Sequence, residues 1–218
     1  GYDPNNPYSG RDPRLQQTVI TNGSTWKGQT VQSFIGGTNG KPITNATKTG
    51  YYLKKYVIEA INLQPTNTTS REHTWVLFRY GEVLLNYAEA MNEAYGPENA
   101  NSLGLTALEA VNLIRQRANM PNFPSGLSQN QFRDKLRNER MVELAFEDHR
   151  FWDIRRWKIG QQTTDIYQME ITPNNTGGGF VFEKKLLEVR AFEDRMNLYP
   201  IPQAELFKNR NLTQNIGW

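Results

Sequence analysis

The fold is decided by residues 131–157, QFRDKLRNERMVELAFEDHRFWDIRRW. With about 100° between successive residues of a helix, apolar side chains gather on two sides of this stretch. One side carries Phe132, Leu136, Val142 and Phe146, and the other carries Met141, Leu144 and Ala145. A helix that is apolar on two sides packs against other structure on both, so we expect this one to lie inside the molecule.

Two carboxylates, Glu139 and Glu143, fall inside the larger apolar arc. A buried carboxylate must be paired, because an isolated buried charge is very costly. The same stretch offers arginines as candidate partners: Arg133, Arg137, Arg140, Arg150, Arg155 and Arg156. We therefore expect a central helix fixed by an ion-pair lattice, and then a short aromatic-rich helix or turn over residues 151–157 that ends by Gly160. The expected lattice consists of Glu139, Arg140, Glu143, Glu147, Arg150, Asp153, Arg155 and Arg156.

Capping signals place two further helices before the central one. A helix over about residues 79–95 stops at Gly96-Pro97. Thr106 and Glu109 form a capping-box pattern, which predicts a helix that ends before Pro121. The two helices form a predicted αα-hairpin. A second capping box, residues 128–131, opens the central helix.

The rest of the chain is rich in loops. Residues 16–50 are dense in Thr, Asn and Gly and show no regular apolar period. Short strands are predicted within residues 50–61, and residues 180–190 are weakly strand-like. After Gly160 we expect a loop that contains the glycine run 177–179, and Pro202 starts a last short helix. The predicted fold class is mainly α, with long irregular loops and a few short strands.

Composition excludes several classes of protein. The chain has 218 residues, enough for one sizeable core. Its mean hydropathy is −0.70, and no apolar run approaches the length of a membrane span. The net charge of +3 comes from 25 bases interspersed with 22 acids, without the basic run of a nucleic-acid-binding protein. Cysteine is absent, so disulfides and thiolate metal sites are excluded. The first residues lack the features of a signal peptide.

Catalytic and metal sites find little support in the residue spacing. Glu139 and Glu143 could serve as the paired carboxylates of a glycoside hydrolase, but such a pair must open onto a cleft, and we favour the structural lattice. The two histidines, His73 and His149, lack both the spacing of a zinc site and the context of a serine triad. The glycine run lacks the context of a phosphate loop. No cofactor and no metal are expected.

Three aromatic residues are candidates for ligand contact: Tyr8, Trp26 and Phe34. Trp26 lies deep in a polar loop, and the other two belong to the same part of the chain. An aromatic ring flanked by Thr, Asn and Lys suits a carbohydrate, since the ring stacks on the C–H face of a sugar while polar groups bind its hydroxyls. The alternative is that Trp26 folds back and fixes the loop to the scaffold.

The residues 139–157, ERMVELAFEDHRFWDIRRW, resemble the signature of the SusD/RagB family. Further blocks agree in order and character with that family, and they span nearly the whole chain. They are residues 12–15, 50–53 with Lys55-Tyr56, 79–90, 114–118, 198–202 and 214–218. One departure is Gly81, where the resemblance leads us to expect alanine; we expect it to lower helix propensity and to change little else.

The resemblance implies a SusD-like fold with a tetratricopeptide-like helical hairpin, and it implies that residues 1–218 are the C-terminal domain of a longer protein. The preceding part would hold more helical repeats, a signal peptide and a lipid-bearing cysteine, the sole attachment to the membrane. Such a protein is a non-catalytic lipoprotein on the surface of the bacterial outer membrane. It captures glycans, or peptides in the RagB branch, together with a TonB-dependent transporter.

The resemblance assigns no ligand residues to this chain, so Tyr8, Trp26 and Phe34 rest on the reasoning above. Three hypotheses remain open at this stage. The chain binds a nutrient, or it hydrolyses glycosides through Glu139 and Glu143, or it is a docking scaffold whose ligand contacts lie in the preceding part of the protein.

Overall fold

The computed structural model describes residues 3–218. Its helices are α1 (Arg14–Thr18), α2 (Tyr80–Tyr95), α3 (Ala107–Arg117), α4 (Gln129–Glu143), α5 (His149–Arg156) and α6 (Gln203–Lys208), with 3-10 turns at Gly160–Thr163 and Asp194–Asn197. Its strands are β1 (Val19–Ile20), β2 (Thr25–Trp26), β3 (Gln29–Thr30), β4 (Tyr52–Leu53), β5 (Asp165–Pro173) and β6 (Phe180–Val189). The fold is mainly helical with long loops, as the sequence predicts.

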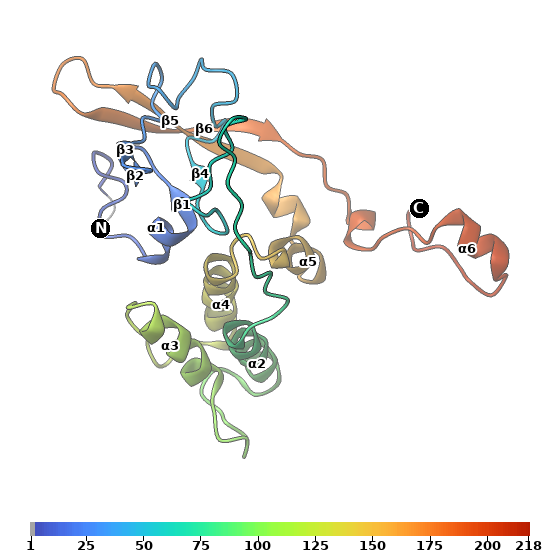
Figure 1. Cartoon of the computed structure of the whole chain (residues 1–218). Helices are drawn as coiled ribbons and strands as arrows, with labels where there is room; N and C mark the ends of the chain where they lie inside the picture. Colours follow the sequence, from blue (N-terminus) through green and yellow to red (C-terminus); the bar gives the residue numbers. More distant parts are fainter. Residues whose placement is uncertain (1–2) are drawn as a thin grey trace.

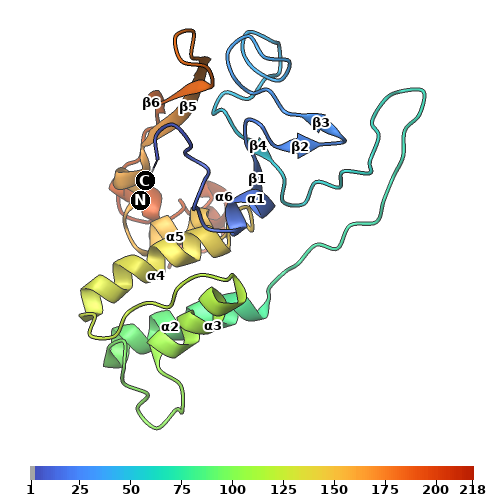
Figure 2. The ribbon, with the colours of Figure 1, turned by 90° about the vertical axis from the view of Figure 1, so that its left-hand side faces the viewer.

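Helices α2, α3 and α4 lie side by side at one end of the molecule (Figures 1 and 2). The predicted starts of all three helices, and the predicted stops of α2 and α3, are confirmed. Thr106 and Glu109 form the reciprocal capping box at the start of α3, and Ser128 and Gln131 form the one that opens α4. Gly96, at φ +85°, ends α2 in a conformation that favours glycine.

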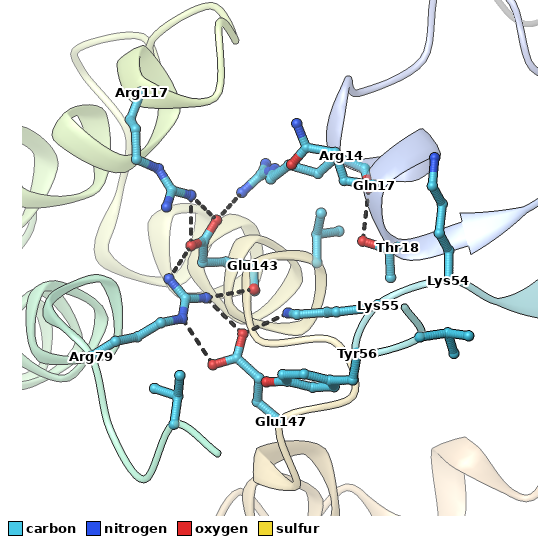
Figure 3. Close-up of a pocket in the computed structure, with 13 residues that line it drawn as sticks. Arg14, Gln17, Thr18, Lys54, Lys55, Tyr56, Arg79, Arg117, Glu143 and Glu147 are labelled. Carbon is cyan, nitrogen blue, oxygen red and sulfur yellow. Dashed lines mark hydrogen bonds and ion pairs between the residues drawn. The ribbon is translucent and has the colours of Figure 1, made fainter. Parts of the chain in front are cut away.

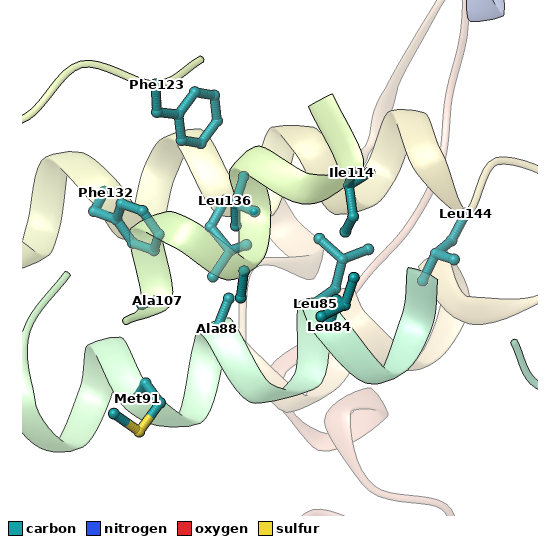
Figure 4. Close-up of a cluster of buried hydrophobic side chains, with 12 residues drawn as sticks. Leu84, Leu85, Ala88, Met91, Ala107, Ile114, Phe123, Phe132, Leu136 and Leu144 are labelled. Carbon is teal, nitrogen blue, oxygen red and sulfur yellow. The ribbon is translucent and has the colours of Figure 1, made fainter. Parts of the chain in front are cut away.

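The hydrophobic core lies between these three helices (Figure 4). Each helix contributes residues spaced by three or four positions, which places them on one face. The buried side chains are Leu84, Leu85, Ala88 and Met91 from α2, Ala107, Ala110, Val111 and Ile114 from α3, and Phe132 and Leu136 from α4, with Phe123 and Leu144 beside them. The stripe of α4 continues past Leu136 into Glu139, Arg140 and Glu143, which are also buried.

The expectation that the central helix is covered on two sides needs correction. Met141 is 41% exposed, so the second side of α4 is only partly covered. The helix also ends at Glu143, and the chain then turns sharply, with Phe146 and Asp148 at positive φ. Phe146 therefore leaves the helical arc and is 53% exposed. The period of the sequence continues beyond the point at which the helix stops.

A long antiparallel hairpin, β5–β6, lies at the other end of the molecule (Figure 1). The prediction of a strand near residues 180–190 is confirmed by β6, whereas the expected loop at the position of β5 is wrong. The glycine run forms the connecting turn, where Gly178 and Gly179 have positive φ. The hairpin supports the loop-rich N-terminal part, since Ile35 donates to the carbonyl of Ile171 at 2.8 Å.

Short strands organise the remaining loops. Strand β1 pairs with β4, and β2 pairs with β3 across the two-residue turn Lys27–Gly28, where both residues have positive φ. The segment between β4 and α2 has no helix or strand, and much of it runs at a distance from the rest of the molecule (Figure 2). After β6 the chain forms an arm that carries α6 away from the other helices (Figure 1). Among residues 3–218, no helix is long and apolar enough to cross a bilayer.

We predict that Phe132→Ala destabilises the protein by about 3–5 kcal/mol, because it removes a fully buried ring from the core and leaves a cavity. Urea denaturation followed by circular dichroism measures this loss. The matched control is Phe207→Ala on α6, where the ring is 76% exposed and the change should stay within about 0.5 kcal/mol. Equal losses in the two variants would contradict the placement of the core.

Candidate functional site

The buried carboxylates of α4 are held by arginines from three other parts of the chain. Nη1 of Arg14 donates to both of them, at 2.7 Å to Glu139 Oε1 and 2.8 Å to Glu143 Oε2. Arg115 of α3 binds the second oxygen of Glu139 at 2.5 Å. Glu143 also accepts from Arg79, at 2.6 Å, and from Arg117, at 2.7 Å (Figure 3). Both carboxylates are therefore fully clasped by guanidinium groups.

Arg14 is itself buried and serves as the hub of this lattice. Its Nη2 and Nε donate to the carboxylate of Asp12, at 2.5 and 2.9 Å, so the guanidinium contacts three carboxylates. The proline between Asp12 and Arg14 occupies the N-cap position of α1 and holds this part of the chain in a turn. Arg14 thereby ties the loop-rich N-terminal part to α4.

Glu147 extends the lattice beyond the end of α4. Arg79 donates to its carboxylate from Nε and from Nη2, both at 2.8 Å, and Lys55 Nζ donates to it at 2.6 Å. Arg79 also donates from Nη2 to the carbonyl of Glu143 at 2.8 Å. The turn after α4 is thus fixed by Arg79, the residue that precedes α2.

The arginine partners expected for Glu139 and Glu143 were wrong. Arg133 binds the exposed Glu93, and Arg137 lies over the ring of Trp157 at 4.9 Å. Arg155 lies over the ring of Phe151 at 3.5 Å and donates to a carbonyl. Within residues 3–218, neither Arg150 nor Arg155 forms an ion pair. Arginines on α4 itself project from other sides of the helix than Glu139 and Glu143 do. The guanidinium groups that bind these two carboxylates therefore come from distant segments of the chain.

Three of the remaining expected members form a second cluster. Arg140 Nε binds Asp153 at 2.7 Å, and Arg156 Nε binds the other oxygen of Asp153 at 2.9 Å. Arg156 also binds Glu89 of α2, which accepts from Trp157 Nε1 at 2.8 Å. This cluster joins α4, α5 and α2, whereas the Arg14 lattice joins α4 to α1, α2 and α3.

Gly81 has a role beyond helix propensity. A Cβ built at this position would lie 2.6 Å from Arg79 Nη1 and 3.2 Å from Glu143 Oε1. Glycine therefore leaves room for the Arg79–Glu143 ion pair against the first turn of α2. The expectation that Gly81 changes little else needs this correction.

The lattice keeps Glu143 and Glu147 ionised. Burial by itself raises the pKa of Glu143, but hydrogen bonds from Arg14 and Arg79, with the charges of Arg79 and Arg117, hold that pKa below its ordinary value of 4.5. The pKa of Glu147 is also lowered, because hydrogen bonds and charges from Arg79 and Lys55 outweigh the effect of burial, which by itself would raise that pKa. A general acid must carry a proton near neutral pH, so Glu143 is poorly suited to that role.

A groove of about 630 Å³ opens above the lattice, and we call it the charged groove (Figure 3). Its charged lining consists of Arg14, Lys54, Lys55, Arg79, Arg117, Glu143 and Glu147. Every carboxylate in this lining accepts from at least two cationic side chains.

A second groove, of about 550 Å³, contains Trp26, and we call it the tryptophan groove. Its polar lining includes the amides of Asn62 and Gln64. Tyr56 lines both grooves, and its backbone has a φ of +68°, a strained conformation for a bulky residue. Trp75 stacks on Tyr56, with ring centroids 5.6 Å apart and an interplanar angle of 26°, and is 58% exposed. Trp75 itself lines neither groove, but it is stacked on a residue that lines both and leaves an aromatic surface exposed.

The other two aromatic candidates lie away from Trp26. Phe34 packs against Phe180 at 4.8 Å, and Tyr8 meets Phe182 edge-on at 5.6 Å. Both rings are half-buried on the β5–β6 hairpin, and Tyr8 also lines a mostly apolar groove of about 430 Å³. The structure thus joins Tyr8 to Phe34 through β6 and places Trp26 elsewhere; ligand contact remains a prediction for all three.

Sequence reasoning missed the arginines of the lattice and the aromatic pair. The missed residues are Arg14, Arg79, Arg115, Arg117, Tyr56 and Trp75. A signal for five of them was present, because all except Trp75 lie within the sequence blocks that carry the family resemblance. Their shared place in one lattice and one groove becomes visible only when the blocks are brought together by folding.

Comparison with known proteins gives one consistent result. The model of the SusD family matches residues 1–218. The SusD-like protein P2 of Formosa agariphila is 32% identical over 171 residues, which are 75% of this chain and 29% of that protein. The chain therefore spans less than a third of the length of this curated relative.

Two solved structures from Bacteroides fragilis NCTC 9343 are also similar. One is a SusD-like protein, 30% identical, with a TM-score of 0.79 over 100% of this chain and 41% of the other. The second is described as a SusD-like carbohydrate-binding protein. It is 28% identical, with a TM-score of 0.66 over 97% of this chain and 43% of the other.

We predict that Arg14→Met destabilises the protein by about 3 kcal/mol, because it leaves buried carboxylates with too few cationic partners. The matched control is Arg190→Met, which breaks an exposed pair with Glu188 and should cost about 0–1 kcal/mol. Urea denaturation at pH 7 compares the two. A loss below about 1 kcal/mol for Arg14→Met would show that the lattice does not hold the fold.

The lattice also predicts how stability depends on pH. The pKa of Glu143 is lower in the folded protein than its ordinary 4.5, so its stabilisation is complete above pH 4.5 and is lost as the pH falls towards the folded pKa. We expect the free energy of unfolding to decline with acidification below 4.5, and to decline less steeply in Glu143→Gln. Urea denaturation between pH 7 and pH 3 measures both slopes, and identical slopes would refute this role for Glu143.

Proposed function

Because the chain belongs to the SusD family, we propose that it binds glycans without cleaving them. We propose further that the full-length protein is a lipid-anchored protein of the outer-membrane surface, which passes its glycan to a TonB-dependent transporter. The family resemblance supports this wider role, and the likeness to the carbohydrate-binding structure from Bacteroides fragilis supports the class of ligand.

The observation that carries the proposal is the exposed ring of Trp75, which stacks on Tyr56, a residue that lines the tryptophan groove. A flat, exposed ring offers stacking to the C–H face of a sugar, and Trp75 is held in place by its stack on Tyr56. The amides of Asn62 and Gln64 and the ammonium group of Lys27 line the adjoining groove and suit sugar hydroxyls.

The strained backbone of Tyr56 supports the same location. A bulky residue at positive φ costs about 1–3 kcal/mol, and such strain concentrates at ligand sites. Tyr56 also meets the ring of His73 edge-on at 5.5 Å, so its ring is fixed from more than one side. We infer that this strain positions the ring where the two grooves meet.

The clasped carboxylates speak against the alternative of hydrolysis. A glycoside hydrolase needs one protonated carboxyl group and one free carboxylate beside the bond that is cleaved. Glu139 and Glu143 share the same Arg14 nitrogen, and each has a further arginine on its other oxygen. Neither carboxylate is left to transfer a proton.

We predict that a glycan array and calorimetry detect saturable binding of a polysaccharide or oligosaccharide to the protein. Trp75→Ala and Trp26→Ala should each weaken it by about tenfold, the effect of losing about 1.4 kcal/mol of stacking. The matched control is Trp152→Ala on α5, whose ring is as exposed as that of Trp75 but contacts Phe151 and Tyr199 in place of Tyr56. Saturable binding of peptides alone would move the chain to the peptide-binding alternative.

A separate assay tests catalysis. We expect no release of reducing sugar from any polysaccharide that the protein binds, either with the unaltered protein or with Glu143→Gln. Sugar release that disappears in Glu143→Gln would establish a hydrolase and overturn the proposal.

A further inference from the structure

The charged groove carries an excess of positive charge. Its lining has five cationic side chains and two carboxylates. The ionised groups directly behind the lining, Asp12, Arg115 and Glu139, add two negative charges and one positive charge, and the excess remains. The carboxylates are therefore outnumbered even when the buried part of the lattice is included.

The excess lies at the mouth of the groove, because the inner cations are already engaged. The donors of Arg14, Arg79 and Lys55 already form ion pairs. Their partners are Asp12, Glu139, Glu143 and Glu147. Arg117 contacts Glu143 through Nη2 alone, its side chain is 58% exposed, and its other donors remain available. The ammonium group of Lys54 has no ion pair or hydrogen bond within residues 3–218.

Arg117 and Lys54 stand on opposite sides of the groove (Figure 3). Arg117 projects from the end of α3, and Lys54 projects from the segment after β4, whose backbone is tied to α1 by a hydrogen bond from Lys54 N to Thr18 O at 3.0 Å. The floor between them contains Glu143, which already accepts from three arginines. A negative group placed between Lys54 and the open donors of Arg117 would complete the charge balance of the groove.

The charged groove adjoins the tryptophan groove, because Tyr56 and Val57 line both. A glycan that stacks on Trp75 beside Tyr56 would extend towards the charged groove, whose lining includes Lys54 and Arg117. Arginine presents a planar fork of donors that matches the oxygens of a carboxylate or a sulfate. This combination of stacking and charge defines a class of ligand.

Building on the glycan-binding function proposed above, we propose that the charged groove is an anion subsite and that the ligand is an acidic glycan. The groove takes the carboxylate of a uronic acid or the sulfate ester of a sulfated sugar. Arg117 and Lys54 bind that anion, while Tyr56 and Trp75 stack on an adjacent ring.

Calorimetry with two pairs of probes tests the subsite and separates the two sources of charge. One pair is oligogalacturonate and its fully methyl-esterified, neutral form. The other is a sulfated galactan oligosaccharide and its desulfated form. We expect the charged member of one pair to bind at least about tenfold more tightly than its neutral partner, and to lose affinity as salt screens the contact.

Variants then locate the effect. The Lys54→Met/Arg117→Gln double variant should lose at least tenfold in affinity for the acidic probe and retain its weaker binding of the neutral one. The matched control, Lys208→Met/Arg210→Gln on the C-terminal arm, removes the same charge and should bind as the unaltered protein does. Lys54→Met alone provides a variant whose lattice is intact, since Lys54 has no ion pair to lose, and it should show several-fold weaker binding.

The outcomes separate this inference from the proposed function. Equal affinity for charged and neutral probes, or equal losses in the groove variant and the arm variant, would overturn the anion subsite and leave glycan binding in place. Absence of binding to every glycan, with Trp75→Ala without effect on any ligand, would overturn the proposed function as well.

Discussion

The fold depends on one guanidinium group, that of Arg14, whose Nη1 is shared by Glu139 and Glu143 of α4. The face of α4 that packs in the core turns from apolar to acidic after Leu136, and its charges are met by arginines from other segments. Such buried pairs add little net stability relative to a well-packed apolar core. We infer that their contribution is one of placement, because α4, α3 and the loop-rich N-terminal part can dock in only one arrangement.

The same placement creates the site. Arg14, Arg79 and Arg117 reach Glu143 from different sides, and all three line the charged groove (Figure 3). Lys55 joins the lattice through Glu147, and this contact holds the neighbouring Tyr56 at the junction with the tryptophan groove. The lattice and the proposed ligand site are therefore linked in one chain of contacts, in which the carboxylates of the floor are saturated while Arg117 keeps open donors and Trp75 an exposed ring.

Local patterns in the sequence predicted the helices from α2 onwards, because caps and apolar stripes act within a few residues, but they did not predict the short α1, which lacks a side-chain cap. Strand β5 was missed although Tyr167, Met169 and Ile171 alternate, since a polar segment leading to a glycine run was interpreted as a loop. The lattice shows a deeper limit. The need to pair Glu139 and Glu143 could be predicted, but Arg14 lies 125 positions from Glu139, and no local period connects them. The aromatic pair of Tyr56 and Trp75 was missed for the same reason.

The central claim is that Glu143 of α4 is an ionised structural group and that it does not serve as the general acid of a hydrolase. Carbon-13 NMR of the Glu143 side-chain carboxyl group during a pH titration of the folded protein tests this claim most directly. The account predicts that Glu143 stays ionised while the pH falls to 4.5, the ordinary pKa of glutamate, and titrates only below it. A carboxyl group that takes up its proton above pH 4.5, as the general acid of a hydrolase does, would contradict the account.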